Sequence, residues 1–251
     1  MLFMKKLISL ALSIVLMLSV FSVGTFAKDS TTVYKNASDT IKFVIYDGKK
    51  TAPPISVVKA QLEADGGVRD VYFIGMLGTE NNKGQVNVVG NYLRALFCLD
   101  NAYLQLVKDV IFENIEEGSA LILTGHSLGG MVAQQVAADR DIKEKYEVIG
   151  TVTAGSPYMI TCGKPEGTVS RLADLGDFIP KMGLATILLP FRQFLTPIYG
   201  NGGFLLDPDG AHNKSYIAPA VWGEYDALGI KGGSAKIIFN SDDIVLFGAA
   251  E

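Results

Sequence analysis

A serine bracketed by two glycines is the first candidate for chemistry in this chain of 251 residues. The segment Gly125–Gly129 (GHSLG) follows apolar residues and precedes a stretch typical of a helix. In a tight turn from strand to helix, the residues two before and two after the serine must lack side chains so that strand and helix can approach. Such a turn exposes the hydroxyl of Ser127 and leaves the N–H of Leu128 at a helix N-terminus, where it can stabilise an oxyanion. The pattern predicts that Ser127 is a nucleophile in acyl transfer, and the alternative is a turn with a capping serine.

A serine hydroxyl is a poor nucleophile without a general base, and the sequence contains only two histidines, His126 and His212. His126 is adjacent to Ser127, and because neighbouring side chains diverge at such a turn, it is badly placed to accept the proton. We expect His126 to pack or hydrogen-bond beneath the turn. His212 lies in a predicted loop after an apolar segment, and elimination makes it the leading candidate for the base.

A carboxylate that orients the base would complete this set of residues. Asp174 and Asp177 lie between the serine and the histidine in the chain, which is the order that goes with this kind of turn. Either carboxylate could hold the imidazole and stabilise its charged form. Asp207 and Asp209 are too close to His212 in the sequence to be attractive, and we expect them to be turn residues.

The segments around Ser127 predict the elements that would position it. Apolar runs alternate with segments whose apolar residues recur every three or four positions, the spacing of one helix face. The predicted strands are 71–77, 119–124 and 148–154, and the predicted helices are 99–117 and 128–138. This alternation of strand and helix indicates a parallel sheet covered by helices.

Three further elements are predicted outside this alternation. The apolar stretch Ile41–Tyr46 ends at a turn signal, which favours an N-terminal strand or hairpin. The segment Ser56–Glu63 is typical of a helix that stops before Asp65. The C-terminal segment Ala235–Phe247 is typical of two short strands around a turn, to which we assign no function.

The composition indicates one folded domain without a metal or organic cofactor. With 49% hydrophobic and 19% charged residues, the chain can bury a large core, and neither a repeat nor a linker divides residues 28–251. Its two cysteines and two histidines are widely separated and give no zinc-site spacing. Cys98 and Cys162 could form one disulfide, and the bonded and free states stay open.

The first 27 residues have the pattern of a signal peptide. Lys5 and Lys6 precede the apolar run Leu7–Phe21, and small residues lead up to Ala27. The alternative is an uncleaved membrane anchor, and both imply export, so we expect a secreted or extracytoplasmic protein. Without this segment 20 basic and 26 acidic residues remain, a net charge of −6. An acidic surface argues against nucleic acid as a partner.

Four segments resemble one known family in the same order along the chain. Residues 124–130 (TGHSLGG) resemble the elbow of the class 3 (fungal-type) lipases, which belong to the α/β-hydrolase superfamily. Residues 78–79 (GT) are similar to the family's Arg-Gly-Thr/Ser segment, and residues 153–157 (TAGSP) to its Thr-Phe-Gly-x-Pro strand end. Residues 177–180 (DFIP) resemble the Asp-x-Val-Pro segment that carries its catalytic aspartate. The resemblance extends from Val68 to Tyr216.

This resemblance implies a fold and a set of roles. The fold would be an α/β-hydrolase type, with a mostly parallel sheet flanked by helices and a strand-turn-helix nucleophile elbow. The resemblance favours Asp177 over Asp174 as the catalytic acid and gives the second oxyanion donor to Thr79. His212 and Tyr216 fit the family's closing histidine motif. The activity implied is hydrolysis of carboxylic esters, of acylglycerols or related lipid esters, with possible contact to a lipid interface.

The sequence also departs from the family pattern. Leu77 stands where the family has an arginine before Gly-Thr, and Tyr158 replaces the usual arginine after Ser-Pro. Residues 80–90 are too polar for an ordinary lipase lid. The apolar segment Leu184–Leu206 could instead form an acyl-binding wall or flap over the site, and the alternative is ordinary core.

Three classes of function fit these features. A secreted lipase or carboxylesterase agrees with all of them. A phospholipase, thioesterase, deacylase or acyltransferase would use the same residues, since a triad sets the reaction and not the substrate. A surface binding protein that kept the fold without the chemistry would lack a triad residue, and the sequence contains a candidate for each.

Overall fold

The computed structural model describes residues 30–45, 53–79, 88–159, 162–183, 198–204 and 206–248. The chain divides into two compact units, Met1–Thr31 and Thr32–Glu251, and the second unit contains the candidate site. The predicted signal peptide, and residues 184–197 and 205 of the predicted flap, lie outside the described residues. Within the described ranges, no helix is long and apolar enough to cross a membrane.

The described strands form one largely parallel sheet, in the order β1-β8-β2-β3-β4-β5-β6-β7, with β9 also pairing on β2. The parallel part consists of β3 (Gly67–Met76), β4 (Ala120–His126), β5 (Glu147–Ala154), β6 (Thr168–Asp174) and β7 (Ile198–Gly200). The remaining strands are β1 (Thr31–Tyr34), β2 (Ile55–Ala64), β8 (Lys236–Asn240) and β9 (Val245–Phe247). β2 is antiparallel to β3, β8 and β9. The predicted mixed α/β class with a mostly parallel sheet is confirmed.

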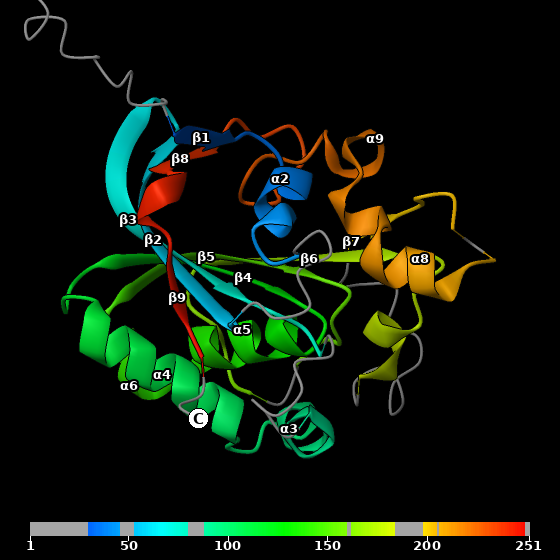
Figure 1. Cartoon of the computed structure of the whole chain (residues 1–251), viewed down its shortest axis with the longest axis horizontal. Helices are drawn as coiled ribbons and strands as arrows, with labels where there is room; N and C mark the ends of the chain where they lie inside the picture. The colour runs from blue at the N-terminus through cyan, green and yellow to red at the C-terminus, as the bar shows by residue number, and fades with distance from the viewer. Residues whose placement is uncertain are drawn as a thin grey trace, which may run out of the picture. The chain divides into compact units, whose positions relative to one another are not determined.

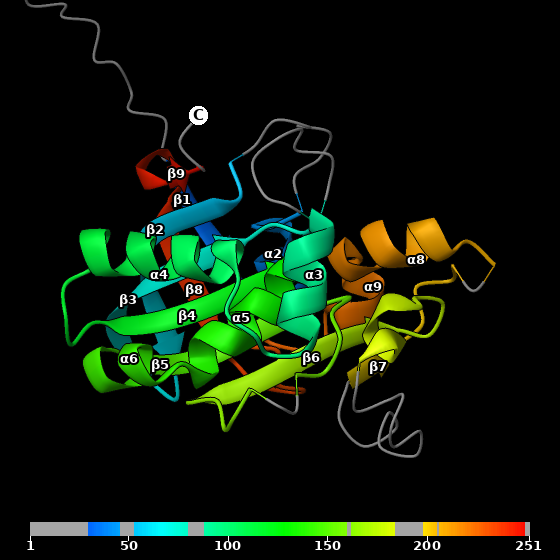
Figure 2. The same cartoon turned by 90° about the horizontal axis from the view of Figure 1, so that it is seen from below.

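Helices cover both faces of the sheet. In Figure 1, α4 (Ala102–Asn114), α5 (Leu128–Ala138) and α6 (Arg140–Lys145) lie below it, and α2 (Ala37–Lys42) and α9 (Pro219–Trp222) lie above. α3 (Val88–Leu96) lies beside α5, as Figure 1 and Figure 2 both show. In the described part of the chain, the other short helices are η1 (Ile179–Met182), α8 (Pro208–Asn213), η3 (Ser215–Ile217) and η4 (Ser241–Asp243).

Alternation along β4 produces two hydrophobic cores. Leu121 and Leu123 belong to the core shared with α4 and α5, whereas Ala120 and Ile122 belong to the core shared with α2 and α9. Successive side chains of a strand point to opposite faces, so a strand covered on both faces is apolar throughout. This explains why residues 119–124 form a continuous apolar run. Ser127 thus comes immediately after a strand that is buried on both faces.

Two predicted elements were wrong. The run Ile41–Tyr46 was predicted as an N-terminal strand or hairpin, but Ile41 and Lys42 are the last residues of helix α2. This helix begins after Asn36, whose side-chain oxygen accepts the N–H of Asp39 at 2.9 Å. Ser56–Glu63 was predicted as a helix, but it lies in strand β2. Short apolar runs do not distinguish helix from strand by periodicity alone.

A two-residue turn explains the error at β2. Asp65 and Gly66 both have positive φ, 51° and 76°, and join β2 to β3 as an antiparallel hairpin. That conformation at both central residues is the hairpin turn preferred by Asp-Gly sequences. An Asp-Gly pair is also compatible with the end of a helix, so the sequence by itself does not distinguish the two. The predicted C-terminal strands are confirmed as β8 and β9, which both extend the sheet beside β2.

The two cysteines are bonded. Cys98 follows α3 and Cys162 follows β5, and their Cα atoms are 5.1 Å apart. The disulfide thus connects two segments that are 64 positions apart in sequence. It ties the connection between α3 and α4 to the loop that leaves the carboxyl end of β5.

Candidate active site

Ser127 lies in a strained turn between β4 and α5. Its φ and ψ are 53° and −121°, a region that residues with a Cβ rarely occupy and that often marks functional positions. A Cβ at Gly125 would collide with the backbone of Gly129, and one at Gly129 would collide with the carbonyl of Met76. The strand and the helix therefore approach each other too closely for any side chain at these two positions.

The surroundings of Ser127 place backbone donors near its hydroxyl. Ser127 is the N-cap residue of α5, but its side chain makes no capping hydrogen bond, so helix capping does not occupy the hydroxyl. The N–H of Leu128 belongs to the first turn of α5, whose N–H groups lack partners within the helix. On the other side, a Cβ built on Gly78 would be only 3.0 Å from Cβ of Ser127. The segment that ends in Thr79 therefore lies directly against the elbow.

His212 is paired with a buried carboxylate. Its Nδ1 is 2.8 Å from Oδ2 of Asp177, whose side chain is only 1% exposed. Because a carboxylate accepts, the Nδ1 of a neutral His212 carries the proton and Nε2 is the basic nitrogen. Asp177 also accepts the N–H of Ile179 at Oδ1, at 2.9 Å. His212 lies in the short helix α8, not in the loop that was predicted.

Asp174, the other candidate acid, serves the backbone instead. Its Oδ1 accepts the Gly176 N–H at 2.7 Å, and its Oδ2 accepts the Gly202 N–H at 2.6 Å. The residue is fully buried. Both of its oxygens therefore hold the loop after β6 to the segment after β7, and of the two candidates it is Asp177 that the structure brings to His212.

Contacts through Gly155 connect the histidine to the elbow. The N–H of Ser127 donates to Ala154 O at 2.9 Å, and a Cβ built on the next residue, Gly155, would lie 3.1 Å from Nδ1 of His212. Gly155 has a φ of 59°, so glycine is needed there both for conformation and for space. Among the described residues, no hydrogen bond joins Ser127 Oγ to His212. Catalytic hydrogen bonds of this kind often tighten only with substrate.

Tyr216 is buried beneath the carboxylate. Its hydroxyl donates to Oδ2 of Asp177 at 2.7 Å and accepts the N–H of Asp174 at 3.0 Å. Burial, and then the charge of Asp177, raises the pKa of Tyr216 well above its usual value. The phenol therefore stays protonated and serves as a fixed donor to the carboxylate. The sequence indicated Tyr216 only as part of the histidine motif and gave it no role.

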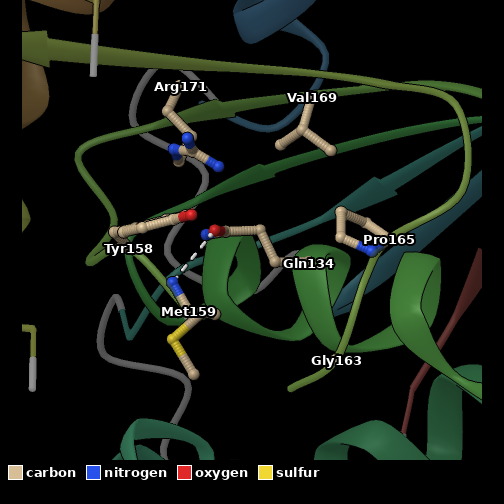
Figure 3. Close-up of a pocket in the computed structure, with 7 residues that line it drawn as sticks. All are labelled: Gln134, Tyr158, Met159, Gly163, Pro165, Val169 and Arg171. Carbon is tan, nitrogen blue, oxygen red and sulfur yellow. Dashed lines mark hydrogen bonds between the residues drawn. The ribbon is translucent and has the colours of Figure 1, made fainter. Parts of the chain in front are cut away.

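Gln134 is a buried residue that the sequence analysis missed. Its side-chain Nε2 donates to Pro157 O at 3.0 Å and to Ser156 Oγ at 3.1 Å, and its Oε1 accepts the Met159 N–H. Figure 3 shows Gln134 reaching from α5 to this segment, which continues from Gly155. The signal that could have found it is the pair of adjacent glutamines, Gln134 and Gln135, in a helix whose other residues are apolar.

The tyrosine that departs from the family pattern has an arginine partner. Figure 3 shows Arg171, on β6, beside Tyr158, and the guanidinium carbon lies 4.0 Å from the ring centroid. Guanidinium groups stack favourably on aromatic faces. An arginine is thus present next to position 158, but it comes from β6 and not from the segment after β5.

The described residues contain no group of three histidine, cysteine, aspartate or glutamate side chains able to hold a metal ion.

Comparison with known proteins gives one family. Residues 67–183 match the family model described as lipase (class 3). No curated protein and no solved structure matches the chain. The matched segment runs from β3 to the residue after η1, so it contains Thr79, Ser127 and Asp177, whereas His212 lies beyond it. Residues 67–183 therefore form a class 3 lipase domain, and the protein is a triacylglycerol lipase-like hydrolase.

Proposed function

We propose that this protein is an exported serine hydrolase that cleaves lipid esters through Ser127, His212 and Asp177. The observation that carries the proposal is the 2.8 Å contact between His212 Nδ1 and the buried carboxylate of Asp177, at the same end of the sheet as a strained serine. A buried carboxylate that fixes the imidazole leaves Nε2 as the base.

The proposed reaction proceeds in two halves. As Ser127 Oγ attacks the ester carbonyl, His212 Nε2 takes its proton, and the N–H groups of Leu128 and Thr79 stabilise the oxyanion. The tetrahedral intermediate collapses when His212 gives that proton to the leaving alcohol, and the acyl group stays on Ser127. Water then attacks the acyl-enzyme with His212 as base, which releases the carboxylic acid and restores the serine.

The surface near Asp177 and His212 supports a lipid ester as substrate. Leu175, Phe178 and Met182, which lie within five residues of Asp177, are 46%, 67% and 47% exposed. Leu206, six positions before His212, is 96% exposed. Three of these four apolar side chains lie within one short segment, residues 175–182, and a patch of such side chains would favour contact with an apolar ligand.

The disulfide supports export. Bonds such as that between Cys98 and Cys162 persist in oxidising compartments and are rare in the cytosol. Together with the signal-peptide pattern of residues 1–27, this favours cleavage after Ala27 and a secreted or extracytoplasmic mature protein. N-terminal sequencing of the exported protein tests this, and a chain that begins at Met1 contradicts cleavage.

A fluorophosphonate probe tests the proposed nucleophile. We expect the mature protein to be labelled, and Ser127→Ala and His212→Ala to abolish labelling, because removal of a triad residue typically costs about 10⁶-fold in turnover. A panel of p-nitrophenyl esters from acetate to palmitate then separates a lipase from a short-chain esterase. Folded wild-type protein that is not labelled would contradict the proposal and favour a binding protein.

A further inference from the structure

His126 contacts the main chain of the proposed base. It is the last residue of β4, immediately before Ser127, and is 3% exposed. Its Nε2 lies 2.8 Å from the backbone oxygen of His212, and the two imidazole rings are 4.6 Å apart between centroids. Because a carbonyl only accepts hydrogen bonds, Nε2 of His126 must carry a proton.

The carbonyl that His126 binds is one that the helix leaves unpaired. His212 lies in the last turn of α8, where carbonyls have no intrahelical partner. In the part of the chain that the structure describes, no backbone N–H donates to it. At the other end of α8, the side chain of Asp207 accepts the Gly210 N–H at 2.9 Å. A helix of six residues is not stable by itself, so these two side chains hold the helix that carries the base.

The ionisable groups facing His126 favour its neutral form. They are His212 on α8, Tyr216 on η3 with its ring centroid 6.0 Å away, and Asp177 after β6. Burial, and then the neighbouring His212, lowers the pKa of His126 to about 3. A neutral imidazole donates at Nε2 without placing a second positive charge beside His212 when that residue takes up the serine proton.

We propose that His126 is a positioning residue whose Nε2–H fixes the main chain of His212 and thereby sets the distance from the base to Ser127. The inference rests on the proposed triad. Because His126 is covalently joined to Ser127, a single hydrogen bond connects the nucleophile elbow to the helix that carries the base. Among the described contacts of His212, those of its ring with Asp177 and Gly155 orient the imidazole, whereas the hydrogen bond from His126 holds its main-chain carbonyl.

Paired variants test this role with a short-chain p-nitrophenyl ester. In His126→Leu the donor is lost, and we expect kcat to fall by about 10²-fold with little change in KM, the typical cost of misplacing a catalytic group by about 1 Å. His126→Gln can place an N–H near the position of Nε2, so it should restore most of kcat. Equal kcat values in the two variants, or a loss confined to KM, would overturn the proposal.

A control variant separates positioning from stability. Ile237→Ala truncates a fully buried side chain on β8, which is remote from the site in the sheet order. It should lower Tm without lowering kcat at a temperature where the protein is folded. If kcat of Ile237→Ala falls as far as that of His126→Leu at the same Tm, the effect is one of stability and the proposal fails.

The tautomer gives a readout independent of activity. The chain has only two histidines, so ¹⁵N spectra of the untagged mature protein contain two imidazoles, and His126→Gln assigns them. We expect His126 to remain neutral and protonated at Nε2 from pH 5 to 8. An Nδ1-protonated ring, or titration in this range, would overturn the proposal. If the wild-type protein shows the expected tautomer but is inactive, the proposed triad is wrong, whereas the hydrogen bond from His126 to the His212 carbonyl stands.

Discussion

Loss of the disulfide should cost the protein a measurable part of its stability. Cys98 and Cys162 are 64 positions apart, so the bond closes a loop of about 65 residues in the unfolded chain. The loop-entropy relation gives a stabilisation of about 4 kcal/mol for a loop of that length. In a domain of this size, 1 kcal/mol corresponds to roughly 2–4 °C in Tm. The double variant Cys98→Ser/Cys162→Ser should therefore melt roughly 8–16 °C below the wild type.

Calorimetry of the mature wild type and the double variant measures this difference, and thiol titration in denaturant without reductant checks the bond. The wild type should show no free thiol, and reductant should shift its Tm towards that of the variant. At 25 °C the variant should keep its esterase activity, because the contacts described above for Ser127, His212 and Asp177 do not involve the disulfide. Two reactive thiols in the wild type, or a Tm that neither reductant nor substitution lowers, would refute the reasoning.

Three further perturbations follow from the site. Tyr216→Phe removes a hydrogen bond to the Asp177 carboxylate, which is worth about 1.5–3 kcal/mol. Urea unfolding should show this loss of stability, and an unchanged unfolding midpoint would contradict the contact. Gly129→Ala forces a Cβ into the carbonyl of Met76, so we expect little folded, labelled protein, whereas normal expression and labelling would be inconsistent with the elbow. The lowered pKa of His126 means that the unfolded chain binds a proton as pH falls below about 6.5 while the folded chain does not, until pH approaches about 3. Stability should thus decrease by up to about 1.4 kcal/mol per pH unit over this range, and denaturation curves of His126→Gln should lack that part.

The elbow could be predicted because its requirements are local. Glycines at positions 125 and 129, an apolar run before them and a helix pattern after them are all visible in sequence, and the structure has β4 and α5 at those positions. The errors at Ile41–Tyr46 and Ser56–Glu63 have a common cause. Both are short apolar segments whose state depends on the neighbours they pack against, and sequence periodicity does not record those neighbours.

The sequence by itself determined the class of chemistry. It contains one serine in an elbow pattern and two histidines, one of which is adjacent to that serine, so it predicted Ser127 as the nucleophile and His212 as the base. It left Asp174 and Asp177 equivalent until family resemblance favoured one. Only the tertiary structure separated them by their contacts. Asp174 ends β6 and Asp177 lies three residues further on, and the partners that distinguish them, Gly202 and His212, come from distant segments.

The tertiary structure also decided what surrounds these residues. It paired Cys98 with Cys162, gave Tyr216 two polar partners and set His126 against the backbone of His212. Each of these contacts joins residues that are at least 39 positions apart in the sequence. Such contacts arise when the carboxyl ends of parallel strands gather at one edge of the sheet. Local sequence encodes the strands and helices, whereas their order in the sheet determines which side chains meet.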